Sequence, residues 1–349
     1  MAGKKRVAVL GLGHWYAAYG VGRALRESSR AELVAAASPN PKHLEEYTRH
    51  FGVKGYSSYE ELLKNEDVDI VQIATPVSEQ KDVTVMCARA GKHMILGKPP
   101  AMTVAESEEM VAAVHKAGVL CFPFQCHMRL TYLDLKARVD NGDIGDVLLM
   151  HQTSRWSIAE DWLNSGTPGW FADPKHVPGG SLIDEGIYFM DFFRWLTGHE
   201  IVRVEAKTAN ILHKELKVED WGFAFFTLSN GVMCTLEGAW TIVSPQKTAP
   251  SPKQNSVVRI EIVGNRGEIS DQFFRVPNRS VLAAGAKDWV HEQHRDHGPS
   301  SLDHLLDCLE KGRQTIGTID DAHRSFVAAM AAYDAARTGS AVVLGGADL

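Results

Sequence analysis

Short apolar runs alternate with helix-length amphipathic stretches over the first third of the chain. The runs cover residues 7–10, 33–37, 69–74, 93–96 and 119–122. Runs of this length suit strands that are buried on both faces, as in a parallel sheet. Two of the stretches between them open with a Ser/Thr-x-x-Glu capping box, Ser58 with Glu61 and Thr103 with Glu106. Strand and helix in alternation predict a parallel α/β domain over residues 1–125.

The pattern changes after about residue 125. Residues 147–155, 201–209, 222–228, 232–239 and 257–263 predict longer strands, and turn sequences such as 229–231 (Ser-Asn-Gly) separate several of them. Long strands joined by short turns predict a large, open, mainly antiparallel sheet. Residues 302–338 carry apolar residues at helical spacing, interrupted at 315–318. We expect a second, α+β domain over residues 126–349, with its C-terminal helical region packing back on the body.

Composition narrows the possible partners. A chain of 349 residues is long enough for two hydrophobic cores. Its net charge of -6 disfavours a nucleic-acid or membrane partner, because a polyanion would be repelled on average. The apolar run at 7–12 is too short for a signal peptide or a membrane span, and five scattered cysteines without a Cys-x-x-Cys pair suit a reducing compartment. These features predict a cytoplasmic protein with a small-molecule partner.

A nucleotide-binding turn is predicted where the first strand ends. The run at 7–10 leads into Gly11-Leu12-Gly13, and a helix-length segment begins at His14 and Trp15. The first glycine permits a tight turn, the second lets the backbone approach a pyrophosphate, and the start of the helix offers N–H groups and a positive dipole end. Tyr16 stands where the dinucleotide fingerprint has a small residue. We predict NAD or NADP at this turn.

The end of the second strand leaves the cofactor choice open. It reads Ala37-Ser38-Pro39, with Lys42 nearby. No carboxylate there would repel a 2′-phosphate, and no arginine is in obvious reach to bind one. Ser38 could bond either a ribose hydroxyl or a phosphate.

Several motifs in chain order carry a family resemblance. They are Gly11-Leu12-Gly13, Ala74-Thr75-Pro76, Gly91-Lys92-His93, Gly97-Lys98-Pro99 and residues 179–188, Gly-Gly-Ser-Leu-Ile-Asp-Glu-Gly-Ile-Tyr. Together they resemble the glucose-fructose oxidoreductase and inositol dehydrogenase (Gfo/Idh/MocA) family. The resemblance implies a Rossmann domain whose cofactor also meets Thr75 and Pro76, and a second domain for substrate binding and oligomerisation. It implies a homodimer or homotetramer that covers the open sheet.

The resemblance also implies site residues. Lys98 corresponds to the catalytic lysine beside the nicotinamide, and Asp184 to an aspartate of the site. Tyr188 stands where many members have an acid–base histidine. Tyrosine at this position is similar to the branch with glucose-fructose oxidoreductase and dimeric dihydrodiol dehydrogenase, in which that tyrosine is taken as the proton donor or acceptor. Asp191 matches a further acidic position. Three positions depart from the family pattern: Gly97 replaces a glutamate, Gln80 a histidine and Tyr132 a proline.

Tyrosine is a poor base at neutral pH because its ordinary pKa is about 10. A lysine ammonium about 4 Å away contributes about 4 kcal/mol at an effective dielectric constant of about 20, which corresponds to a lowering of about three pKa units. Lys98 is therefore expected to favour the phenolate of Tyr188. Asp184 would bond a substrate hydroxyl or steady Lys98.

Aromatic and basic residues near the motif at 179–188 are substrate-binding candidates. Trp156, Trp162 and Trp170 could stack on sugar C–H groups, or equally pack in a core or an interface. Arg129 and His176 complete this set. His291, His294 and His297 have metal-like spacing, but a solvated loop is the favoured interpretation, so no metal is expected.

The sequence therefore predicts an NAD(P)-dependent oxidoreductase. By resemblance, its substrate is a secondary alcohol or ketone of a sugar, an inositol or a related cyclic polyol. Two alternatives remain. One is a cofactor-binding regulator that has lost its chemistry, because fold never guarantees activity. The other is a glycoside-processing enzyme that uses transient oxidation with bound cofactor.

Overall fold

The contacts within the chain divide it into two units. A computed structural model describes residues 3–157, 169–242, 256–274, 278–293 and 298–345. The first unit comprises Met1–His127 and Pro299–His323, and the second comprises Met128–Gly298 and Arg324–Leu349. The first boundary lies two residues beyond the one expected. The segment Pro299–His323 groups with the first unit, an arrangement that the sequence pattern did not indicate.

The first unit is built on a six-stranded parallel sheet of the Rossmann type, with strand order β3-β2-β1-β4-β5-β6. Its strands are β1 Lys5–Leu10, β2 Ala31–Ala37, β3 Lys54–Tyr56, β4 Ile70–Ile73, β5 His93–Leu96 and β6 Cys121–Pro123. The middle strands β1 and β4 are nearly all buried, as the continuous apolar runs predict. Because β1 and β4 pair in parallel, their carboxyl ends are neighbours at the same end of the sheet.

Helices connect consecutive strands of this sheet. They are α1 Trp15–Glu27, α2 Pro41–Phe51, α3 Tyr59–Asn65, α4 Val77–Arg89 and α5 Val104–Ala117. The short η1 Phe124–Cys126 follows β6, and α10 Ser301–Lys311 comes from the later segment. Both predicted caps are confirmed, because Ser58 Oγ accepts the N–H of Glu61 at 3.3 Å and Thr103 Oγ1 accepts that of Glu106 at 3.2 Å. Helix α11, Ile319–Thr338, crosses the division between the units.

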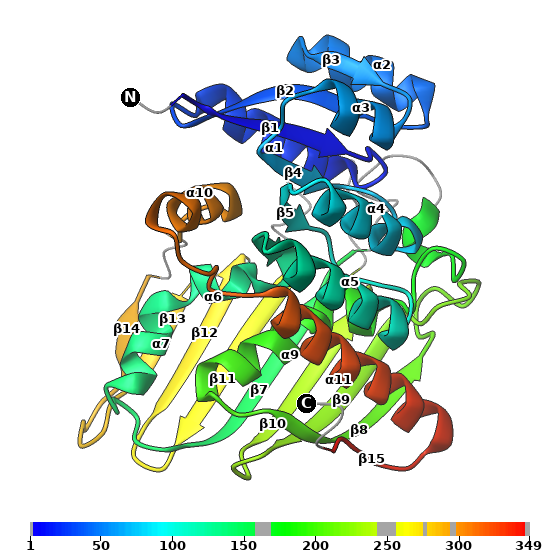
Figure 1. Ribbon diagram of the computed structural model, residues 1–349. Helices are drawn as coiled ribbons and strands as arrows, with labels where there is room; N and C mark the ends of the chain where they lie inside the picture. Colours follow the sequence, from blue (N-terminus) through cyan, green and yellow to red (C-terminus); the bar gives the residue numbers. More distant parts are fainter. Residues whose placement is uncertain (1–2, 158–168, 243–255, 275–277, 294–297, 346–349) are drawn as a thin grey trace. The chain divides into compact units, whose positions relative to one another are not determined.

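The second unit is built on a nine-stranded sheet, drawn mostly in green and yellow in Figure 1, with β14 in orange and β15 in red. Its order is β14-β13-β12-β11-β7-β10-β9-β8-β15, and every neighbouring pair is antiparallel except β7 and β10. The strands are β7 Val147–Arg155, β8 Ile201–Ala209, β9 Trp221–Leu228, β10 Met233–Ala239, β11 Val257–Gly264, β12 Glu268–Phe274, β13 Asn278–Leu282, β14 Val290–Glu292 and β15 Val342–Val343. The predicted fold class, a parallel sheet followed by a mainly antiparallel one, is confirmed.

Helix α9, Ser181–Thr197, lies across the middle strands β7, β10 and β9 of this sheet (Figure 1). Two paired glycines let it approach closely: a Cβ on Gly222 would lie 2.6 Å from Leu182 Cβ, and one on Gly238 would lie 2.8 Å from the Ser181 carbonyl oxygen. Among the described residues, the other helices of this unit are α6 His127–Thr131, α7 Leu133–Asp140, the short η2 Gly169–Ala172 and most of α11. Within the described residues, no helix is both long enough and apolar enough to cross a membrane.

Candidate active site

The predicted nucleotide turn is formed at the carboxyl ends of β1 and β4. Gly11 has a φ of +83°, and a Cβ there would lie 2.4 Å from Thr75 Cγ2 and 2.8 Å from the Thr75 backbone nitrogen. Its own N–H donates to the Ala37 carbonyl at 2.9 Å. Only glycine fits this conformation and this space. The turn therefore has the close backbone approach that a pyrophosphate site requires.

Helix α1 begins directly after this turn. The N–H of His14 donates to the Ala74 carbonyl at 2.9 Å, and His14 makes no side-chain capping bond to the helix. Tyr16 is half-buried and its ring packs on that of His14, with 4.2 Å between centroids. The small residue Ala18 of this helix is fully buried, and Tyr47 Oη donates to its carbonyl at 3.0 Å. Tyr16 does not belong to the buried residues of α1.

The residues around the turn fit a dinucleotide. Thr75 is 1% exposed, and its hydroxyl has no hydrogen-bond partner among the described residues, so it can bond a ligand. Ser38 is also buried, and its Oγ accepts the N–H of Asn40 at 3.2 Å. Asn40 in turn caps α2 by accepting from Lys42 and His43. With neither a carboxylate nor an arginine at 38–41, NAD and NADP remain undistinguished.

Lys98 lies just beyond the end of β5 and is only 4% exposed. It follows Gly97, and the peptide bond to Pro99 is cis. The Gln80 amide, on α4, donates from Nε2 to the Pro99 carbonyl at 3.0 Å. A lysine this buried is rare unless it has a task, which agrees with the role that the resemblance implies.

Helix α9 carries Asp184, Tyr188 and Asp191 at spacings of four and three residues, which places them on one face. Asp184 and Tyr188 are half-buried, whereas Asp191 is fully buried. Trp240, just beyond β10, donates from Nε1 to Asp184 Oδ2 at 3.2 Å. A residue at the end of a sheet strand therefore fixes the position of one carboxylate oxygen of Asp184.

The residues of α9 favour the protonated form of Tyr188. Desolvation raises the pKa of Tyr188 well above its ordinary value, and the negative charges of Asp184 and Glu185 raise it further. Lys98 belongs to the first unit and Tyr188 to the second, so the lowering of the pKa that we expect from Lys98 stays a prediction.

The N-terminus of α9 is capped by residues distant in sequence. Glu219, 7% exposed, accepts the Gly180 N–H through Oε2 and the Leu182 N–H through Oε1, both at 2.9 Å. Tyr333 Oη donates to Glu219 Oε1 at 2.8 Å and accepts the Ile183 N–H at 3.2 Å. The first N–H groups of the helix, which a helix cannot satisfy itself, thus find partners. This cap fixes the start of the helix that carries Asp184 and Tyr188.

Of the tryptophan candidates, Trp156 lies beside this cluster. Its backbone N–H donates to the Ala239 carbonyl at 2.8 Å, because β7 and β10 end side by side. Its indole donates to Ser154 Oγ at 2.9 Å, and Ser154 lies 3.4 Å from a carboxylate oxygen of Glu185. Trp156 and Trp240 thus flank the same end of the sheet.

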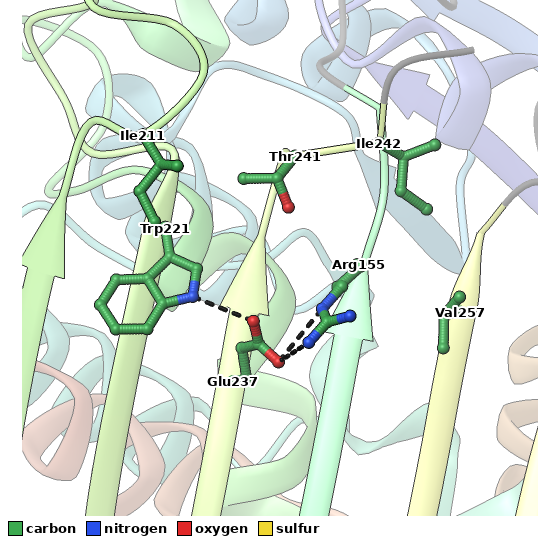
Figure 2. Close-up of a pocket in the computed structure, with 7 residues that line it drawn as sticks. All are labelled: Arg155, Ile211, Trp221, Glu237, Thr241, Ile242 and Val257. Atoms are coloured by element: carbon green, nitrogen blue, oxygen red, sulfur yellow. Dashed lines mark hydrogen bonds and ion pairs between the residues drawn. The ribbon is translucent and has the colours of Figure 1, made fainter.

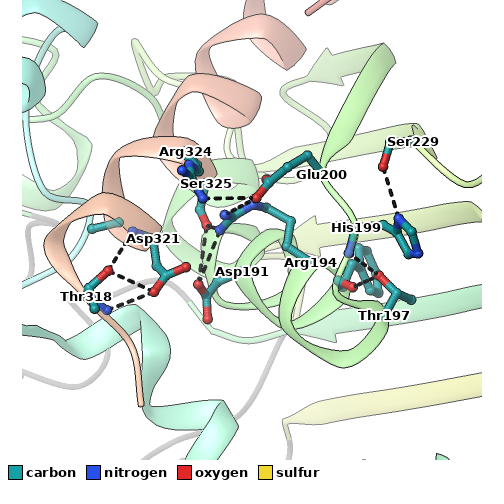
Figure 3. A network of polar contacts seen from close by, with 12 residues as sticks. Asp191, Arg194, Thr197, His199, Glu200, Ser229, Thr318, Asp321, Arg324 and Ser325 are labelled. Atoms are coloured by element: carbon teal, nitrogen blue, oxygen red, sulfur yellow. Dashed lines mark hydrogen bonds and ion pairs between the residues drawn. The ribbon is translucent and has the colours of Figure 1, made fainter. Parts of the chain in front are cut away.

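Arg129, by contrast, is part of a buried ion-pair network. Its Nε and Nη2 donate to the two oxygens of Asp191 at 2.7 and 2.6 Å, and both side chains are almost fully buried. Arg194 continues the network from Asp191 to Glu200 (Figure 3). These two donors of Arg129 hold α6 to α9, so they serve the structure, and the predicted contact of Arg129 with substrate stays a prediction.

Two further candidates, Trp170 and His176, lie on the stretch that precedes α9. Trp170 stacks on Phe171 with ring centroids 3.9 Å apart, and the backbone of His176 closes a turn onto the Asp173 carbonyl at 2.8 Å. Trp162, His294 and His297 lie outside the described residues. Among the residues that are described, no three His, Cys, Asp or Glu side chains form a group that could hold a metal ion.

A cavity of about 430 Å³ opens on the other side of the nine-stranded sheet (Figure 2). Glu237 lies at its centre, accepting from Trp221 Nε1 at 2.9 Å and from Arg155 Nη2 at 2.7 Å. These three side chains alternate along their strands with residues that face α9, so they point away from it. The cavity is therefore separate from Asp184 and Tyr188.

Sequence reasoning missed Trp240, Glu219 and Tyr333. They reach α9 across sequence separations of 56, 39 and 150 residues respectively. None of them belongs to a local motif, so no spacing rule points to them. The one available signal was Glu219-Asp220, an acidic pair directly before an apolar strand.

Comparison with known proteins agrees with this geometry. Residues 5–125 match the oxidoreductase family with an NAD-binding Rossmann fold, and residues 132–270 match the GFO/IDH/MocA C-terminal domain. The scyllo-inositol 2-dehydrogenase (NAD(+)) of Bacillus subtilis is 27% identical, covering 97% of this chain and 96% of that protein. The trans-1,2-dihydrobenzene-1,2-diol dehydrogenase of Xenopus laevis is 25% identical over 80% of this chain and 82% of its own length.

Among solved structures, the aldose-aldose oxidoreductase of Caulobacter crescentus, complexed with glycerol, superposes with a TM-score of 0.81. It is 27% identical and covers 98% of this chain and 100% of its own. Both domains of the chain thus match in order and over nearly their whole length. The chain belongs to the Gfo/Idh/MocA family of NAD-binding oxidoreductases.

Proposed function

We propose that this protein is an NAD(P)-dependent dehydrogenase or reductase that acts on a secondary alcohol or ketone of a sugar, an inositol or a related cyclic polyol. The observation that carries the proposal is the pair Asp184 and Tyr188 on one face of α9, with Asp184 held by Trp240. The relatives that act on inositols, aldoses and dihydrodiols support the substrate class.

In this proposal each side chain has one task. The turn at Gly11 and the hydroxyl of Thr75 bind the dinucleotide, which supplies or accepts the hydride when bound. Tyr188 Oη donates a proton to the substrate oxygen during reduction and accepts one during oxidation. Lys98 polarises the same oxygen. Asp184 Oδ1 accepts a hydrogen bond from a substrate hydroxyl, while Trp240 Nε1 donates to Oδ2.

The test begins with titration of the purified protein with NADH and with NADPH. An absorbance screen at the nicotinamide band against cyclic polyols, aldoses, ketoses and glycosides follows. We expect turnover in the wild type and its loss in Tyr188→Phe and Lys98→Ala. Matched controls are Tyr59→Phe, which removes a hydroxyl from α3, and Lys207→Ala, which removes an exposed ammonium from β8. Tight binding of the cofactor without turnover of any substrate would favour the cofactor-binding regulator, or the glycoside-processing enzyme that uses transient oxidation with bound cofactor.

We also propose a homodimer or homotetramer in the cytoplasm. The face of the nine-stranded sheet away from α9 displays Phe223 on β9 and Met233 on β10, which are 39% and 43% exposed. Exposed apolar residues on the same face of neighbouring strands favour coverage by another chain. Light scattering at micromolar concentration tests this, and a single monomer mass would overturn it. The five cysteines are all buried and unbridged, which suits a reducing compartment.

A further inference from the structure

The Gln80 side chain on α4 is enclosed beneath the segment that contains Lys98. Gln80 is 0% exposed, and its Nε2 donates to the Pro99 carbonyl at 3.0 Å. Its Oε1 has no hydrogen-bond partner among the described residues. A fully buried amide with one unused acceptor costs free energy, so a reason is needed for its presence.

Gly97 lies against the same amide. A Cβ at position 97 would be 3.1 Å from Gln80 Oε1, 3.2 Å from Nε2 and 3.3 Å from Cδ. All three distances are tighter than ordinary van der Waals contact, so any larger residue would push the amide aside. The two departures from the family pattern, at 80 and 97, are therefore two sides of a single contact.

One amide thus fixes the residues on both sides of Lys98. It packs against the Cα of Gly97 and holds the carbonyl of Pro99. Because residues 97 and 99 determine where the backbone of residue 98 lies, the amide sets the origin of the Lys98 side chain. We propose that Gln80 is a positioning residue for Lys98, and that Gly97 is required to admit it. This inference rests on the proposed function.

The test compares Gln80→Leu, which keeps the volume and removes both polar atoms, with Gly97→Ala, which displaces the amide. Gln125→Leu is the matched control, because Gln125 is also fully buried in the first unit, donates to one carbonyl (that of Ala322) and leaves its Oε1 without a described partner. We expect kcat to fall by about 10- to 100-fold in the two test variants, since small misplacements have effects of this size, with unchanged affinity for NADH. Gln125→Leu should keep its kcat.

Two further measurements separate positioning from general damage. In hydrogen–deuterium exchange, the peptide covering 96–102 should exchange faster in Gln80→Leu and unchanged in Gln125→Leu. In a double-mutant cycle, Gln80→Leu should reduce kcat no further once Lys98 is alanine. Unchanged exchange, or a kcat loss that multiplies with that of Lys98→Ala, would overturn the inference. If Lys98→Ala alone keeps full turnover, the proposed function fails at that residue and this inference fails with it.

Discussion

Glu219 offers the sharpest test of how α9 is held. Its carboxylate accepts three buried donors, the N–H groups of Gly180 and Leu182 and the hydroxyl of Tyr333. In Glu219→Gln the amide carbonyl still serves two of them, and the NH₂ group faces the third. One of the three buried donors loses its acceptor, which costs about 1–3 kcal/mol. Glu219→Ala leaves all three donors without their acceptor and should cost about 3–6 kcal/mol.

Urea unfolding followed by tryptophan fluorescence measures this cost, because all eight tryptophans except Trp15 belong to the second unit. Glu205→Gln, on an exposed ion pair of β8, is the control and should stay within about 0.5 kcal/mol of the wild type. Tyr333→Phe combined with Glu219→Gln should show a coupling of at least about 0.5 kcal/mol. Additive effects, or a Glu219→Gln protein as stable as the control, would refute the capping role.

The same residue predicts a pH dependence. Burial raises the pKa of Glu219 above 4.5, against the lowering by its hydrogen bonds to Leu182 and Tyr333. The folded state therefore binds its proton more tightly than the unfolded state does. The stability contributed by this group is fully present below pH 4.5, the ordinary pKa of a glutamate. It declines as the pH rises towards the higher pKa that Glu219 has in the folded state. The stability difference between the wild type and Glu219→Gln should narrow over that range, and a difference that widens would contradict it.

Three further substitutions test other contacts. Asp191→Ala should destabilise the second unit by about 3–5 kcal/mol in urea, since it leaves Arg129 buried without its carboxylate, whereas the exposed Asp334→Ala should change little. Gln152→Met should raise the unfolding free energy by about 1 kcal/mol, because neither amide atom of buried Gln152 has a described partner; a loss would point to a bound water. Gly238→Ala should displace α9 and abolish turnover while NADH still binds, and full activity would count against the close packing.

The pattern of apolar and polar residues predicted the long strands well. β7 and β8 have the predicted ends, at 147–155 and 201–209. In β8 apolar and polar residues alternate over residues 202–207, whereas β7 is an apolar run, 147–150, followed by polar residues. The strands that were not predicted, β3 and β12–β14, are mostly short, and polar residues dominate β12 and β13. Such strands form by pairing with a neighbour, a cause that their own sequence does not contain.

The same distinction holds in the candidate site. The glycine turn at 11–13 and the spacing of Asp184 and Tyr188 are local, and a local pattern identified them. Trp240 and Glu219 act on the same helix through contacts made only when distant strands meet, so they could not be found by spacing. Gln80 and Gly97 were noticed only as separate departures from a pattern, and their contact makes them one feature.

The charge around Tyr188 finally connects the structure of α9 to the chemistry. A phenolate at this position would stand close to the carboxylates of Asp184 and Glu185, and both raise its pKa. Donation of the proton during reduction of a ketone leaves this phenolate, and oxidation of an alcohol begins from it. Both directions therefore place a negative charge beside the two carboxylates, and a cation is needed to offset it. We expect Lys98→Ala to lower kcat for oxidation of the alcohol and for reduction of the ketone alike, and the loss of only one direction would contradict this.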